Sequence, residues 1–225
     1  MLSVSFALGA NIHKGSLMTF PFDAVDPKPG DMPNARVVLL NGPPGCGKDT
    51  GGKALIEPPH YQRVPVMGKF AKILKESVHA DFGYPELHHD YFEHCKNMPL
   101  PMFRGKSPRD AYIYKSEKVM KPHYGEDFYG RMWLREALNL YISGYDLFFI
   151  TDSGFASEVQ SLIEVIGPAS ILHVKIDASS RGCTFEGDSR SYLELPGIES
   201  VTVKSDTIEQ YRFDLRAAVY GWVSR

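Results

Sequence analysis

The sequence predicts an α/β fold with a mainly parallel sheet, on three observations. Short apolar runs recur along the 225 residues, and two of them, at 36–41 and 146–151, hold four consecutive apolar residues, as strands buried on both faces do. Segments with helical spacing separate these runs, which is typical of strand–helix–strand units. A glycine-rich turn joins the first run to the first predicted helix.

The predicted strands and helices alternate along the chain. Strands are expected at 36–41, 64–67, 146–151, 170–176 and 200–203. Helices are expected at 48–56, 69–80, 86–96, 126–143, 156–166 and 206–223, with one more that begins at Ser107. Within 69–80, apolar residues recur at the spacing of an amphipathic helix. Ser107, Pro108 and Asp110 form a helix start with a capping residue, and Gly144 and Gly167 end two helices.

Composition and charge exclude several classes of protein. Hydrophobic residues make up 43% and charged residues 23% of the chain, which excludes wholesale disorder. The 25 Lys and Arg residues against 27 Asp and Glu residues give a net charge of −2, so a nucleic-acid polymer is not the expected partner. No run of 18 apolar residues predicts a membrane span. Cys46, Cys95 and Cys183 lie far apart and form no CxxC pair, which fits a reducing cytoplasm.

The chain is interpreted as one domain with an N-terminal extension. Residues 1–34 are expected to be flexible or loosely docked, because they include Asp26-Pro27-Lys28-Pro29-Gly30 and precede the first buried strand. No signal peptide is expected, since no Lys or Arg precedes the mildly apolar start. Residues 35–225 then form a single domain of ordinary size.

The glycine-rich segment has the pattern G-x-x-x-x-G-K of a phosphate-binding loop. It reads Gly42-Pro43-Pro44-Gly45-Cys46-Gly47-Lys48-Asp49-Thr50. The glycines let backbone N–H groups turn toward phosphate oxygens, the helix start adds partial positive charge, and Lys48 reaches the β- and γ-phosphates of a nucleotide. We therefore expect this segment to bind ATP. Asp49 replaces the usual hydroxyl residue and is expected to bind Mg²⁺ with Thr50; the alternative is a favourable anion in the first helical turn.

Several segments occur in an order that resembles the deoxynucleoside monophosphate kinases of tailed bacteriophages, a branch of the P-loop kinases. The resemblance extends over 36–225 and rests on the G-K-D-T of the loop, Lys69-Phe70-Ala71-Lys72-Ile73-Leu74-Lys75, Ser107-Pro108-Arg109 with Lys115-Ser116-Glu117, and the segments 125–133, 143–152 and 202–211. It implies a P-loop NTPase three-layer sandwich with an acceptor-binding helical region at about 80–135 and a lid at about 178–195. The implied reaction moves the γ-phosphoryl group of ATP, with Mg²⁺, to a deoxynucleoside 5′-monophosphate in the host cytoplasm. A homodimer is compatible with it.

The implied reaction assigns roles to individual residues. Phosphoryl transfer depends on positioning and on neutralising charge, and the expected catalytic residues are Lys48, Arg109, Asp152, Arg181 and Arg190. Asp152 follows a buried strand, as a metal anchor would, with a helix cap as the alternative. The expected acceptor-binding residues are Phe70, Lys75, Arg104, Arg109, Glu117 and Arg131. Aromatic residues such as Phe70 are more often core than base-stacking platforms, and the alternative for the others is the solvated surface.

Two departures from the family pattern bear on catalysis. The family's Asp-x-Arg after the third strand reads Asp152-Ser153-Gly154 here, so its arginine is missing, and the family's His-containing lid segment reads 181–190 without a histidine. Arg181 and Arg190 are expected to supply the missing charge. Two other functions stay open. One is a P-loop kinase with a small non-nucleotide acceptor, and the other is a nucleotide-binding module without catalysis, which the missing arginine favours.

Overall fold

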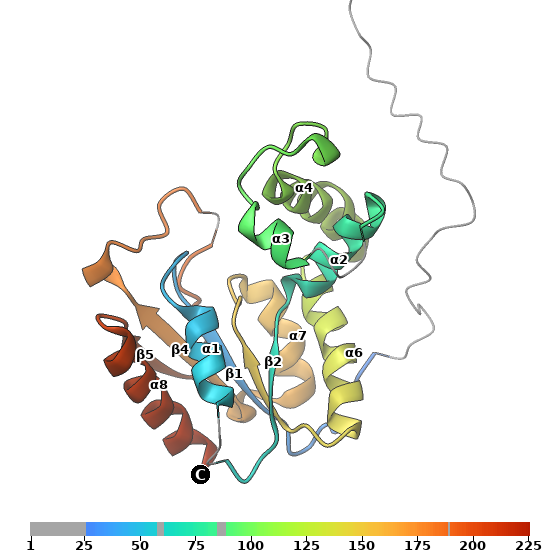
Figure 1. Cartoon of the computed structure of the whole chain (residues 1–225). Helices are drawn as coiled ribbons and strands as arrows, with labels where there is room; N and C mark the ends of the chain where they lie inside the picture. Colours follow the sequence, from blue (N-terminus) through green and yellow to red (C-terminus); the bar gives the residue numbers. More distant parts are fainter. Residues whose placement is uncertain (1–25, 58–60, 85–88, 189) are drawn as a thin grey trace, which may run out of the picture.

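The computed structural model describes residues 26–57, 61–84, 89–188 and 190–225. It contains a five-stranded sheet in the order β2-β3-β1-β4-β5, and every pair of neighbouring strands is parallel (Figure 1). The strands are β1 (Arg36–Asn41), β2 (Pro65–Gly68), β3 (Leu147–Ile150), β4 (Ile171–Asp177) and β5 (Glu199–Lys204). The predicted α/β fold with a mainly parallel sheet is therefore confirmed.

The central strands bury both faces, as their continuous apolar runs predict. Along β1, Val37 and Leu39 enter one hydrophobic cluster while Val38 and Leu40 enter a second cluster. Neighbouring side chains of a strand point to opposite faces of the sheet, so the two clusters are the two sides of a three-layer molecule. The strand register places Val38 beside Phe149 of β3 and Leu172 of β4.

Four helices cover the two faces of the sheet. On one side lie α1 (Lys48–Ile56) and α8 (Ile208–Val223), and on the other lie α6 (Phe128–Ile142) and α7 (Ala156–Ile166) (Figure 1). Trp133 of α6 and Val159 of α7 pack in the first cluster, while Leu55 of α1 and Leu215 of α8 pack in the second. The predicted bounds of α1 and α7 agree with the structure residue for residue.

A group of short helices extends beyond the carboxyl end of β2 (Figure 1). Ser107 and Asp110 form the predicted capping box, with Ser107 Oγ accepting from the Asp110 amide over 3.1 Å and Asp110 Oδ2 accepting from the Ser107 amide over 3.0 Å. The sequence did not predict that the next turn is a π-helix. The group comprises α2 (Ala71–Asp81), α3 (His89–His94), the 3₁₀ turn η2 (Pro101–Phe103), α4 (Pro108–Tyr114), the π-helix η3 (Lys115–Met120) and α5 (Lys121–Tyr124).

Part of the predicted extension packs on the domain. Met32 is only 2% exposed and belongs to the first hydrophobic cluster. Asp26 accepts a hydrogen bond from Arg135 of α6 over 2.7 Å. The boundary predicted at residue 35 is therefore several residues too late, because 26–34 lie on the core; residues 1–25 lie outside the described part. Within the described ranges, no helix has the length and apolar character that crossing a bilayer needs.

Candidate functional site

The glycine-rich loop lies at a place where parallel sheets commonly bind ligands. β1 and β4 are neighbours, but the chain goes from β1 to β2 on one side and from β4 to β5 on the other. Ligands of open α/β sheets bind outside the carboxyl ends of strands at such a switch point. The loop at 42–47 follows β1 there, and the predicted lid segment, residues 178–195, follows β4.

Glycines shape this loop for steric reasons. Gly45 and Gly47 have φ angles of 76° and 103°, which side chains other than glycine rarely allow. A Cβ atom on Gly42 would come within 2.8 Å of Cys46 Sγ and 2.9 Å of the Ile176 carbonyl oxygen. In the described part of the chain, the N–H groups of Gly45 and Gly47 have no acceptor. Free N–H groups at a helix start attract an anion.

Lys48 folds back over the loop. Its Nζ donates to the Gly42 carbonyl over 2.6 Å and to the Pro43 carbonyl over 2.9 Å, and lies 3.6 Å from Cys46 Sγ. Burial lowers the pKa of Lys48, and the positive charge of Arg190 lowers it further. Two predicted catalytic cations are thus close enough to repel each other, which an anion between them would relieve.

Two residues from elsewhere support the loop backbone. Tyr211 of α8 is buried and donates from its hydroxyl to the Gly47 carbonyl over 3.1 Å. Arg181, in the 3₁₀ turn η5 (Ser179–Arg181), donates from Nη2 to the Cys46 carbonyl over 2.8 Å and to Ser205 Oγ over 2.9 Å. Arg181 therefore lies at the predicted site but is bound to the protein backbone. The sequence analysis missed Tyr211 and Ser205, because no local pattern links them to a loop more than 150 residues earlier.

Asp49 is bound by two residues that follow the neighbouring strands β2 and β3. Its Oδ1 accepts a hydrogen bond from Thr151 Oγ1 over 2.7 Å and an ion pair from Lys69 Nζ over 2.8 Å. Burial alone would raise the pKa of Asp49, but the bonds from Lys69 and Thr151 outweigh it and lower that pKa. The Asp49 side chain is still 60% exposed, and its Oδ2 has no partner within the described ranges. Lys69 was missed, although its place directly after a predicted strand was a usable signal.

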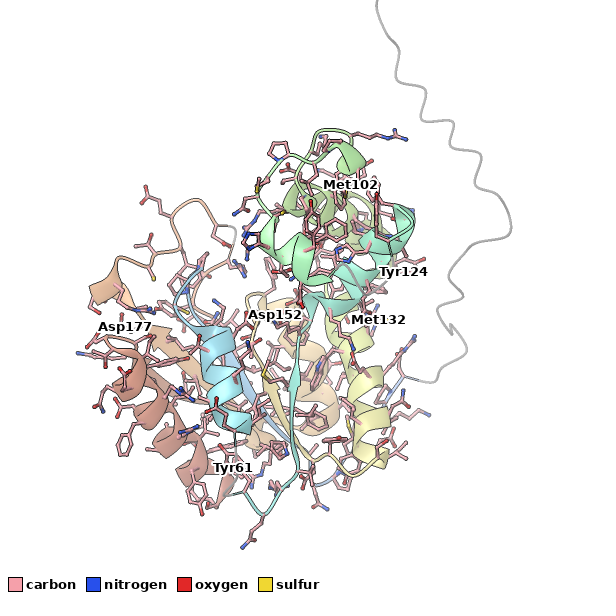
Figure 2. All side chains as sticks on the ribbon, in the orientation of Figure 1. Tyr61, Met102, Tyr124, Met132, Asp152 and Asp177 are labelled. Carbon is pink, nitrogen blue, oxygen red and sulfur yellow. The ribbon has the colours of Figure 1, made fainter. Side chains whose placement is uncertain are left out.

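Asp152 binds a helix start rather than pointing freely into the site. Its two oxygens accept the amides of Phe70 and Ala71, each over 2.9 Å, at the beginning of α2. Figure 2 shows Asp152 at the boundary between the sheet and the short helices. Burial raises its pKa, while these two hydrogen bonds oppose the rise. The predicted alternative of a cap is therefore the contact seen, and the capped helix is α2 rather than the following α7. Thr50 is exposed.

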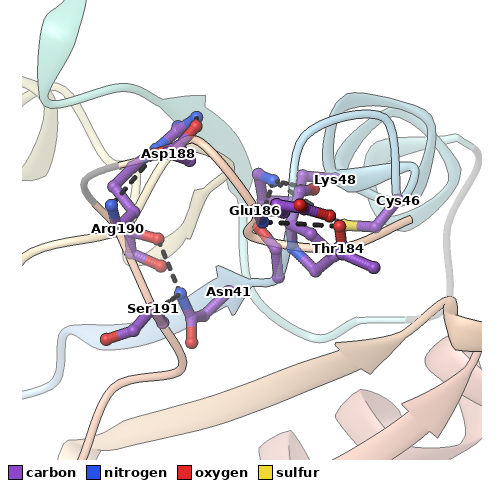
Figure 3. A network of polar contacts seen from close by, with 11 residues as sticks. Asn41, Cys46, Lys48, Thr184, Glu186, Asp188, Arg190 and Ser191 are labelled. Carbon is purple, nitrogen blue, oxygen red and sulfur yellow. Dashed lines mark hydrogen bonds and ion pairs between the residues drawn. The ribbon is translucent and has the colours of Figure 1, made fainter. Parts of the chain in front are cut away.

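Asp188, a carboxylate of the lid segment, is influenced by two of the predicted arginines. Arg190 donates from Nε to Asp188 Oδ1 over 2.8 Å and from Nη2 to Asp188 Oδ2 over 2.6 Å (Figure 3). These bonds lower the pKa of Asp188 to about 2, and the charge of Arg109, at the start of α4, adds to the effect. Arg109 and Arg190, from distant parts of the chain, thus both lower the pKa of Asp188.

Glu158 is a buried carboxyl group that the sequence analysis did not single out. It lies in the first turn of α7 and is 6% exposed. Burial and the negative charge of Asp152 raise its pKa to about 8, although the charges of Lys121 and Arg190 oppose the rise. Its place six residues after Asp152 gave no periodic signal, because the intervening residues form a loop.

Most of the predicted acceptor-binding residues are engaged elsewhere. Phe70 is 2% exposed and packs edge to face on Trp133, which corrects its assignment as an acceptor-binding residue. Lys75 pairs with Glu93 of α3, and Glu117 pairs with Lys121 over 2.7 Å. Arg131 pairs with Asp127 one turn earlier on α6. Arg104 is exposed in the turn after η2 and is not brought to the loop by any contact among the described residues.

Comparisons with known solved structures give a distant likeness. No protein-family model matches the chain, and no curated protein matches it. Among solved structures, an unliganded sugar kinase from Janibacter sp. HTCC2649 is similar with a TM-score of 0.39 and 11% identity, over 84% of this chain and 95% of that chain. A likeness at this level does not support a shared function, so the functional argument rests on the residues of the chain itself.

Proposed function

We propose that the chain is an ATP-dependent phosphotransferase whose acceptor is a deoxynucleoside 5′-monophosphate. The observation that supports this most directly is the loop at the head of α1. It combines N–H groups without acceptors, glycines at positive φ and the ammonium of Lys48 at the carboxyl edge of a parallel sheet. Such a loop binds nucleotide phosphates through its backbone and places the lysine on the β- and γ-phosphates.

The residues present fit Mg²⁺ bound together with a nucleotide. No group of three or more His, Cys, Asp or Glu side chains gathers in the described part of the chain. Mg²⁺ commonly takes one or two carboxylates and completes its shell with phosphate oxygens and water. Asp49 offers an exposed oxygen directly after Lys48 and would hold the ion there. When bound, Mg²⁺ neutralises charge on the β- and γ-phosphates.

Arginines support a phosphorylated acceptor. Arg109 belongs to the short helices, and its charge acts on the same carboxylate that binds Arg190. A guanidinium group matches phosphate oxygens with paired N–H donors. In the proposed step, an oxygen of the acceptor phosphate bonds to the γ-phosphorus of ATP while the bond from that phosphorus to the β–γ bridging oxygen breaks. ADP and a deoxynucleoside diphosphate result.

The test is a coupled assay of ADP release with ATP, Mg²⁺ and a panel of deoxynucleoside monophosphates. We expect acceptor-dependent release, and a loss of roughly a hundredfold in Lys48→Ala, since positioned cations on the reacting group have effects of this size. Lys53→Ala, an exposed lysine on the same helix, is the matched control and should retain activity.

The outcomes separate the proposal from its alternatives. Measurable ATP binding with no turnover on any monophosphate would refute the proposed acceptor. Turnover with phosphorylated metabolites would then indicate a kinase with another small acceptor. ATP binding without turnover on either panel would indicate a nucleotide-binding module.

A further inference from the structure

The side chain of Arg190 crosses the loop after β3 at a glycine. A Cβ atom built on Gly154 would lie 2.5 Å from Arg190 Cδ and 2.8 Å from Arg190 Cγ. Real Cβ atoms do not approach carbon this closely, so the aliphatic part of Arg190 fills the space of a side chain at 154. Position 154 therefore has to be glycine for Arg190 to lie where it does.

Asn41 binds both the loop after β3 and the lid segment where they cross. Its side chain is fully buried at the end of β1, one residue before the glycine-rich loop. Asn41 Nδ2 donates to the Ser153 carbonyl over 3.0 Å and to the Ser191 carbonyl over 3.2 Å (Figure 3). Ser153 precedes Gly154, and Ser191 follows Arg190. One amide group thus ties the crossing segments to each other and to the start of the loop.

Asp188 sets the direction of the Arg190 guanidinium. It occupies the edge formed by Nε and Nη2, through bonds of 2.8 and 2.6 Å. A guanidinium has a second edge, formed by Nη1 and Nη2, which also suits a phosphate. In the described part of the chain, Nη1 of Arg190 has no partner. Asn41 binds the residue after Arg190 and directly precedes the glycine-rich loop, so the lid segment carries Arg190 past the start of that loop.

Resting on the proposed function, we propose that Arg190 binds the γ-phosphoryl group of ATP with its Nη1–Nη2 edge, and that Gly154, Asn41 and Asp188 are its positioning residues. In this proposal the arginine that binds the phosphate belongs to the lid segment, and its side chain passes over Gly154. Asp188 leaves the phosphate-binding edge free, so the ion pair orients the arginine rather than competing with ATP.

The test measures the affinities of Mg²⁺–ATP and Mg²⁺–ADP by calorimetry, without any acceptor. Arg190→Ala should weaken ATP by about tenfold and ADP much less, the size expected for a charge-assisted pair of hydrogen bonds. Gly154→Ala should change the ATP-to-ADP ratio in the same direction, because its methyl group displaces the arginine. The double variant should match Arg190→Ala alone, since both changes act through one group. Gly221→Ala is the matched control, because a Cβ atom there meets nothing within 4 Å.

The results distinguish the proposed function, the role of Arg190 and the packing of Arg190 on Gly154. If the unaltered chain binds neither nucleotide, the proposed function fails. If it binds both and Arg190→Ala leaves their ratio unchanged, the role of Arg190 is wrong while the proposed function stands. Thermal unfolding tests the crossing without nucleotide: Gly154→Ala should lower the melting temperature of the unaltered chain but not that of Arg190→Ala. An equal loss in both backgrounds would overturn the packing argument even if Gly154→Ala folds poorly.

Discussion

Thr151 Oγ1 donates a hydrogen bond to Asp49 Oδ1 over 2.7 Å, which joins the residue after Lys48 to the residue after β3. P-loop nucleotide hydrolases place a hydroxyl group at the first of these positions and hold Mg²⁺ with it and with a carboxylate from elsewhere in the chain. Here the carboxylate Asp49 takes the first position, and the hydroxyl group of Thr151 is bonded to it. Asp152, the next carboxylate along the chain, is engaged with the backbone of α2. Asp49 is therefore the better candidate for the metal.

The first prediction concerns the bonded pair Asp49 and Thr151. Asp49→Asn should raise the Mg²⁺ concentration for half-maximal activity by about tenfold, since a neutral amide is a weaker ligand for a hard cation. The double variant Asp49→Thr with Thr151→Asp exchanges the hydroxyl and the carboxylate within this bonded pair and should recover part of the loss. A Mg²⁺ titration of turnover measures both. Thr50→Ala is the control, and an equal effect of that change would refute the assignment to Asp49.

The second prediction tests the support of the loop by α8. Tyr211→Phe removes the hydrogen bond to the Gly47 carbonyl and should lower the free energy of unfolding by about 1 kcal/mol. Urea unfolding measures the change. Tyr220→Phe, an exposed tyrosine on the same helix, should be close to neutral. Equal losses in the two variants would show that the Tyr211 hydroxyl does not hold the loop.

Local sequence pattern was enough to predict where helices and strands lie, but it did not predict the contacts of several side chains. The bounds of α1 and α7 followed from apolar spacing and the stops Pro58 and Gly167, all of which lie within or beside the helix. The Asp49–Thr151 bond joins residues 102 positions apart, which no local pattern encodes. Phe70 shows the same limit: the sequence marks an apolar residue at a helix start, and only the packing of Trp133 decides that it faces the core.

The packing of Arg190 on Gly154 joins two departures from the family pattern that the sequence shows only separately. The missing arginine at position 154 left catalysis in doubt, and Arg190 was expected to compensate without a known path. The structure gives the path, because the absent side chain at Gly154 is the space that Arg190 fills. Asn41, which holds this crossing, carried no signal beyond its place at the end of a strand.

The third prediction is a pH dependence of stability from Glu158. Burial raises its pKa from 4.5 to about 8, so between these values the folded chain keeps a proton that the unfolded chain has lost. Stability from this group is fully present below pH 4.5 and is lost as the pH rises to about 8, with a slope of at most about 1.4 kcal/mol per pH unit. Glu158→Gln should remove this loss.

The measurement is urea unfolding of both proteins from pH 5 to pH 9. The difference in free energy of unfolding should grow in favour of Glu158→Gln up to about pH 8 and then level off. Glu164→Gln, on the exposed side of the same helix, is the control. A difference that stays constant with pH would show that Glu158 is ionised in the folded chain throughout.

The last prediction separates the two functions of the Asn41 amide. Its Oδ1 accepts from the Leu193 amide over 2.9 Å, while its Nδ2 donates to the Ser153 and Ser191 carbonyls. Asn41→Asp keeps an acceptor for Leu193 but loses the donor, and it should destabilise the chain by about 2 kcal/mol or more, because a buried carboxylate then faces two carbonyl oxygens. Hydrogen exchange should rise in peptides covering 190–195 and much less in β5.

A neutral substitution completes this comparison. Asn41→Ala loses the acceptor as well, so the Leu193 amide should exchange faster in Asn41→Ala than in Asn41→Asp if the lid segment is held through Oδ1. Asn139→Ala, on the exposed face of α6, controls for the loss of an asparagine. Unchanged exchange at 190–195 in both Asn41 variants would mean that the lid segment keeps its place without this amide. The position of Arg190 over Gly154 would then depend on Asp188 and on packing alone.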